Sequence, residues 1–113
     1  MTVLALSLAE FAHAQTPWAP VIRQYADPAV APCLVAVNSH EDAYGTLNQQ
    51  ELNGSDHWGL FQMSSALWGL TPPGRRGGPV QVATAAEQVE AATWAGLTYG
   101  FGSSITWAAS GGC

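Results

Sequence analysis

The sequence contains very few basic residues. Only three of its 113 residues are Lys or Arg, against eight acidic residues, and the formal net charge is −5. The only basic cluster is Arg75-Arg76. Proteins bind nucleic acids and anionic membrane surfaces through extended basic patches. The composition therefore argues against both partners.

The sequence also lacks low-complexity tracts, internal repeats and any apolar run long enough to cross a bilayer. With 113 residues, 48% of them hydrophobic and five of them Trp, the chain can form one domain with one core. The twelve Gly and seven Pro indicate many turns and loops.

Residues 1–14, "MTVLALSLAEFAHA", are predicted to be a signal peptide. Val3 to Ala9 form a short apolar region, and Ala12-His13-Ala14 fits the small-x-small cleavage pattern. No Lys or Arg precedes the apolar region, so an N-terminal amphipathic helix is the alternative. A cleaved signal peptide implies a mature domain of residues 15–113, and a secreted, periplasmic or cell-wall-associated location.

Cysteine is also scarce: Cys33 and Cys113 are the only two. An even number of cysteines in a small exported domain predicts a disulfide. Closing so long a loop would destabilise the unfolded state by about 4.5 kcal/mol in the chain-entropy model. The alternative is one buried thiol and one thiol at the chain end.

The first half of the domain is predicted to contain two helices. Thr16-Pro17 can begin a helix that runs to Ala26, and Asp27-Pro28 can begin a second one over residues 29–41. The second segment, "AVAPCLVAVNSHE", is apolar at nearly every position up to its end, which predicts a buried helix. A buried strand is the alternative for "CLVAV".

The second half is predicted to begin with a loop over residues 45–57 that contains a short hairpin turned at Asn53-Gly54. Ser64 or Ser65 can cap a short helix that ends near Gly69. Other expected segments are a loop over 71–79, the strongest helix over 80–100 with Gly100 as its C-cap, and a last short helix over 103–110. The expected fold class is therefore mostly α, with a small irregular or hairpin segment in the middle.

A polar group of residues, His40, Glu41 and Asp42, ends the buried helix. A carboxyl group near apolar and aromatic side chains has its pKa raised by desolvation, and can then donate a proton to a leaving oxygen. Glycoside cleavage needs such an acid. Glu41 is the better candidate, because it follows the apolar helix directly. Asp42 lies about 100° further around the helix, so the two side chains cannot both point into one pocket.

The segments "APCLVAVNSHEDAYG" and "GSDHWGLFQMSSALW" together resemble the lysozyme-like superfamily, in particular goose-type lysozymes, soluble lytic transglycosylases and resuscitation-promoting factors. In that family a buried helix delivers a catalytic Glu, usually followed by Ser, and a Gly-Leu-x-Gln segment lines the glycan cleft. Here Glu41 and Gly59-Leu60-Phe61-Gln62 stand in these places. "AATWAGLTYGFGSSITWAASGGC" resembles the closing helix of the family.

The resemblance implies a lysozyme-like α+β domain whose catalytic residue is Glu41. Gln62 and Gly59 would bind the glycan, and Tyr44, Trp58 and Tyr99 are candidates for stacking on sugar faces. Each aromatic could equally belong to the core, and Gln62 could serve only as a partner for loop backbone.

The implied function is cleavage of the β-1,4 bond between N-acetylmuramic acid and N-acetylglucosamine in peptidoglycan, by a monomeric enzyme without a cofactor. Ser64 stands where related hydrolases carry a second acid, which favours the lytic transglycosylase route to a 1,6-anhydro sugar. Asp56 is the candidate second carboxylate for hydrolysis. The alternative to an enzyme is a non-catalytic glycan-binding module, because Asp42 replaces the usual Ser.

Other kinds of site have little support. His40, Glu41 and His57 follow no metal-binding spacing, so no metal site is expected. No Gly-x-Ser-x-Gly motif indicates a Ser-His-Asp hydrolase. Arg75 and Arg76 are expected to be solvated loop residues, with the acidic stem peptides of peptidoglycan as a possible partner.

Overall fold

Two short helices, α2 and α3, begin the part of the chain that the computed structural model describes, which is residues 16–41 and 46–107. Helix α2 spans Ala19–Tyr25 and α3 spans Ala31–His40. Both begin later than predicted. Before α3, Asp27 instead closes a turn in which its side chain accepts from Ala29 N at 2.8 Å. Pro20 and Pro32 lie in the first turns of the two helices, where a missing N–H costs no hydrogen bond. The prediction of a helix rather than a strand for "CLVAV" is confirmed.

A small antiparallel sheet follows. Strands β1 (His57–Trp58) and β2 (Met63–Ser64) pair with His57 opposite Ser64. A separate bridge joins Gln50 to Trp58. Between these two bridged residues the chain turns at Gly54, which has φ +79° and donates to Glu51 O at 3.0 Å. The turn predicted at Asn53-Gly54 is therefore present. The pairing of β1 with β2 comes after it and encloses a second turn over residues 59–62.

Helices α4 (Ser65–Leu70) and α5 (Pro72–Arg75) come next. Ser64 caps α4 as predicted, since its hydroxyl accepts from Leu67 N at 3.1 Å. The prediction of a plain loop over residues 71–79 is wrong at its beginning. Thr71 caps α5 by accepting from Gly74 N at 3.3 Å, and Pro72 occupies the first helical position.

The longest helix, α6, spans Ala85–Tyr99. It was expected from residue 80, but Val80–Val82 form a 3-10 turn, η2, and Val82 is 71% exposed. A capping box fixes the true start: Thr84 accepts from Glu87 N at 3.1 Å, and the Glu87 carboxylate accepts from Thr84 N at 2.9 Å. Gly100 is the C-cap, as predicted. The last helix expected over 103–110 is replaced by turns as far as Trp107, where the described residues end.

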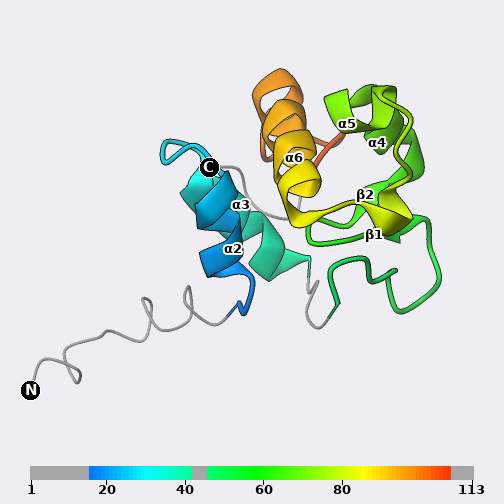
Figure 1. Cartoon of the computed structure of the whole chain (residues 1–113), viewed down its shortest axis with the longest axis horizontal. Helices are drawn as coiled ribbons and strands as arrows, with labels where there is room; N and C mark the ends of the chain where they lie inside the picture. Colours follow the sequence, from blue (N-terminus) through cyan, green and yellow to red (C-terminus); the bar gives the residue numbers. More distant parts are fainter. Residues whose placement is uncertain (1–15, 42–45, 108–113) are drawn as a thin grey trace, which may run out of the picture.

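Helix α6 lies at the centre of the structure (Figure 1). Helices α2 and α3 pack against it on one side and α5 on the other, while α4 packs on α5 and β2. Trp107 closes the core: its ring lies edge-on to Phe61 and stacks on Phe101, and its Nε1 donates to Phe61 O at 2.8 Å. The chain thus forms one compact domain, about half helical with a small two-stranded sheet, which confirms the mostly α class. Within the described ranges no helix is long and apolar enough to span a bilayer.

Candidate active site

Two buried amide side chains fix the peptide groups of Leu60, in the middle of the Gly-Leu-x-Gln segment. Asn38 of α3 donates through Nδ2 to Leu60 O at 2.8 Å, and Gln88 of α6 accepts through Oε1 from Leu60 N at 2.8 Å. Gln88 also donates to Leu47 O at 3.0 Å, and Asn38 accepts from the hydroxyl of Thr16. Buried amides need such partners, and here the partners belong to distant parts of the chain. The segment is therefore held between α3 and α6.

The backbone on either side of Leu60 is unusual. Gly59 has φ +81°, and a Cβ there would lie 2.2 Å from Gln88 Oε1, so any other residue would be strained and would displace the Gln88 amide. Gln62 has φ +47°, which is the left-handed region and costs a non-glycine residue on the order of 1–3 kcal/mol. Its buried side chain compensates, because Nε2 donates to Gln49 O and to Gly59 O, both at 2.9 Å. The turn thus presents Gln62 in one fixed position.

A pocket of about 460 Å³ opens beside this turn. Its walls come from the C-terminal end of α3, from the segment between α3 and β1, and from the turn itself. The lining residues are His40, Glu41, Gln49, Gln50, Glu51, Leu52, Asn53, His57 and Gln62. The pocket therefore brings Glu41 and Gln62, the two residues on which the family resemblance depends, to one concave site.

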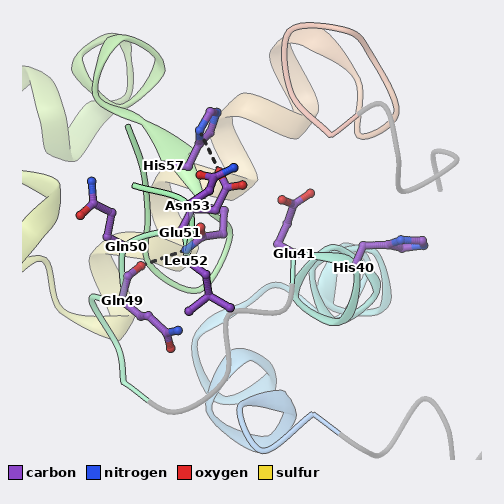
Figure 2. A pocket seen from close by; sticks show the side chains of 9 residues that line it. His40, Glu41, Gln49, Gln50, Glu51, Leu52, Asn53 and His57 are labelled. Carbon is purple, nitrogen blue, oxygen red and sulfur yellow. Dashed lines mark hydrogen bonds and ion pairs between the residues drawn. The ribbon is translucent and has the colours of Figure 1, made fainter. Parts of the chain in front are cut away.

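Glu41 is the C-cap of α3 and is half-buried; its backbone N donates to Val37 O at 3.0 Å. Figure 2 shows its carboxylate on the side of the loop that carries Glu51 and Asn53, whereas the neighbouring His40 points the other way. The buried helix α3 thus ends at the pocket and delivers a carboxyl group to it. This is the placement expected of a catalytic acid.

The opposite wall carries a second group of polar side chains from the turn between Gln50 and β1. The hydroxyl of Ser55 donates to Glu51 Oε2 and lies 3.0 Å from His57 Nδ1. His57 Nδ1 is 3.5 Å from Glu51 Oε2. Glu51 and His57 both line the pocket (Figure 2). The sequence favours Asp56 over Glu51 as a second carboxylate, because an isolated Glu in a loop belongs to no motif.

Asp56, the predicted candidate for a second carboxylate, does not line the pocket. Its Oδ1 accepts from Ser65 Oγ at 2.7 Å and from Trp58 Nε1 at 2.8 Å, and its Oδ2 accepts from Ser65 N at 3.2 Å. The hydrogen bond from the Ser65 side chain, followed by that from Trp58, holds the pKa of Asp56 below its usual value. Asp56 therefore ties β1 to the start of α4.

The predicted aromatic ligands are dispersed. Trp58 is half-buried in β1 with its Nε1 bound to Asp56, and Tyr99 packs edge-on against Trp94 of α6 at 5.7 Å. Neither lines the pocket. Tyr44 lies outside the described residues.

The predicted disulfide would join Cys33 to Cys113. Cys33 is half-buried in α3, and Cys113 lies outside the described ranges, so the bridge stays a prediction.

The two adjacent arginines differ in their contacts. Arg76 forms a two-point ion pair with Glu90, at 2.8 and 3.2 Å, which lowers the pKa of Glu90. The Arg75 guanidinium lies 5.5 Å from the centre of the Trp94 ring. Arg75 is therefore packed on an aromatic face rather than being only a solvated loop charge.

Asn38 and Gln88 were missed from the sequence as residues that build the site. Each interrupts an otherwise apolar pattern: Asn38 follows "CLVAV", and Gln88 lies between Ala85 and Ala92 on the apolar side of α6. A polar residue at such a position is a signal for a buried hydrogen-bonding role. The partner itself could not be inferred.

The part of the chain described by the structure contains no group of three or more His, Cys, Asp or Glu side chains arranged to hold a metal ion. Comparisons of the chain with protein-family models, with curated proteins and with solved structures find no match.

Proposed function

We propose that this chain is an exported, monomeric, lysozyme-like enzyme that cleaves peptidoglycan at the β-1,4 bond between N-acetylmuramic acid and N-acetylglucosamine. The observation that carries the proposal is the pocket, which Glu41 and Gln62 line together although they come from different elements. The resemblance assigns these residues to the catalytic acid and to the glycan cleft.

The lining of the pocket suits an acetamido sugar. Gln49, Gln50, Asn53 and Gln62 carry amide groups, which can donate to or accept from hydroxyl and acetamido groups. Gln50 Nε2 and Asn53 Oδ1 already bind backbone groups of Ser55, which leaves Gln50 Oε1 as an acceptor and Asn53 Nδ2 as a donor. Gln62 uses its Nε2 for two backbone carbonyls, so its Oε1 is the atom left to accept from a ligand. The volume of about 460 Å³ is of the size that takes a small ligand. One or two sugar rings of a longer strand match this space.

Glu41 supplies the proton. In the cleavage step its carboxyl group protonates the glycosidic oxygen as the bond to the anomeric carbon breaks. Either of two acceptors can then capture the anomeric carbon: the 6-hydroxyl of the same muramic acid residue, or water. The first gives a 1,6-anhydro sugar, and the second gives a reducing end.

Digestion of purified cell-wall peptidoglycan with the purified protein tests the proposal. Mass spectrometry of the soluble products should show disaccharide-peptide fragments that are absent when the Glu41→Gln variant replaces the wild type. Binding to insoluble peptidoglycan without release of fragments would contradict the enzyme proposal and support a glycan-binding module instead.

A further inference from the structure

We infer that Glu51 is the second carboxylate of this pocket, and that Ser55 and His57 position it to activate the water that completes the cleavage. The inference rests on the proposed function and narrows it to hydrolysis. It assigns a different residue from the one favoured by the sequence, Asp56.

The hydrogen bonds around Ser55 have a direction. A hydroxyl has one hydrogen, and the Ser55 hydroxyl gives it to Glu51 Oε2. The contact of 3.0 Å between Ser55 Oγ and His57 Nδ1 is then a hydrogen bond in the tautomer that carries hydrogen on Nδ1. The chain of donors therefore runs from His57 through Ser55 to Glu51, and it ends on one carboxylate oxygen.

This arrangement leaves the other oxygen of Glu51 for the pocket. Fixing one oxygen with a hydroxyl sets the orientation of a carboxylate in the way that a supporting residue orients a catalytic base. Figure 2 shows Glu51 and His57 on one wall of the pocket and Glu41 on the other. A sugar held between the walls would meet an acid on one side and a base on the other.

The structure explains both the sequence observation that favoured a single-carboxylate route, at Ser64, and the one that offered another second carboxylate, at Asp56. Ser64 stands where related hydrolases carry an acid, but here its hydroxyl caps α4. Asp56 is engaged through both oxygens with Ser65 and Trp58, outside the pocket lining. Neither residue therefore argues against a second carboxylate at Glu51.

The step balances without a cofactor. The oxygen of a water molecule forms a bond to the anomeric carbon while the glycosidic C–O bond breaks. The proton of Glu41 goes to the leaving oxygen, and a proton of the water goes to Glu51. Exchange with solvent then restores the protonated Glu41 and the ionised Glu51.

Kinetics and product analysis with the full chain and purified peptidoglycan test the inference. Wild-type products should end in reducing sugars. The Glu51→Gln variant should lose roughly a hundredfold or more in kcat with a smaller change in KM, as expected for loss of a general base. Ser55→Ala should lose roughly tenfold in kcat, because Glu51 keeps its charge but loses its orientation. Glu90→Gln removes an acid outside the pocket lining and should change activity less than about twofold.

A measurement on the free protein distinguishes a positioning role of Ser55 from a merely structural one. The ¹⁵N shifts of the His57 ring should report hydrogen on Nδ1 in the wild type. Ser55→Ala should weaken this preference, and Ser55→Ala combined with Glu51→Gln should abolish it, because Glu51 Oε2 also lies 3.5 Å from Nδ1. Anhydro products from the wild type, or full activity of Glu51→Gln, would overturn the inference and leave the proposed function intact. A wild-type protein that releases no fragments would overturn both.

Discussion

The Cα of Gly59 lies so close to the side-chain amide of Gln88 that a Cβ on Gly59 would be 2.2 Å from Oε1. The same Oε1 accepts from Leu60 N at 2.8 Å. The turn that presents Gln62 to the pocket is therefore attached to α6 by a contact that a side chain at residue 59 would disturb.

Gly59→Ala should lower the free energy of unfolding by roughly 2–4 kcal/mol, because it adds backbone strain at φ +81° and disrupts the Gln88–Leu60 hydrogen bond. Gly54→Ala is a matched control: φ is +79°, but nothing lies within 4 Å of the new Cβ. It should cost only about 1 kcal/mol. Urea denaturation of the two variants measures the difference, and equal losses would show that Gln88 can move aside.

Glu41→Gln should abolish release of peptidoglycan fragments while preserving the fold and the binding of insoluble peptidoglycan. The substitution keeps the shape of the side chain but removes the transferable proton. A fragment-release assay, a pull-down with insoluble peptidoglycan and circular dichroism together check this outcome. Turnover like that of the wild type would assign the acid to another residue, and Glu51 would be the first to examine.

Asp56→Asn should make stability less dependent on pH in acid. The pKa of Asp56 is lowered from its ordinary 3.8 in the folded state, chiefly by Ser65, so the folded state favours the carboxylate. The resulting stabilisation is present above about pH 4 and is lost as the pH falls through the lowered pKa. The difference in unfolding free energy between wild type and variant should therefore shrink as the pH falls further below 3.8. Ser65→Ala should reproduce much of this effect, whereas a pH-independent difference would contradict it.

Cys33 and Cys113 should form a disulfide in the mature protein. The mass of the non-reduced protein should be about 2 Da below that of the reduced protein, one hydrogen being lost from each thiol. Replacing both residues by Ser should destabilise the fold by about 4.5 kcal/mol in the chain-entropy model. Two alkylatable thiols in the oxidised, unfolded protein would contradict the prediction.

Local signals predicted α2, α3, α4 and α6, but not always their ends; they missed α5 and wrongly predicted a helix from residue 103. The start of α6 depends on Thr84 and Glu87, three residues apart, and this capping-box pattern is a better guide than the apolar spacing that included Val82. Similarly, the Gly- and Pro-rich composition of residues 71–79 predicted a loop, although Thr71 caps α5 there. In both segments the cap residue fixed the helix start where average composition or apolar spacing had misplaced it.

The candidate site was predictable only in part. Glu41 and Gln62 could be found because each belongs to a short motif with a known spacing. The roles of Gln88 and Glu51 could not be found in this way, because each depends on which side chains or backbone groups the fold brings near. Asp56 was favoured for its position in the sequence, but its neighbours in space are the cap of α4 and the Trp58 ring.

The hydrogen bonds of Gln88 also have a consequence for the order of folding. They connect α6 to residues 28 and 41 positions earlier in the chain, at Leu60 and Leu47. Contacts between such distant residues form only after the entropy of closing a long loop has been overcome, whereas helices form locally and fast. The backbone around Leu60 should therefore acquire protection from hydrogen exchange after α6 does, so that the turn that carries Gln62 is among the last parts of the domain to become ordered.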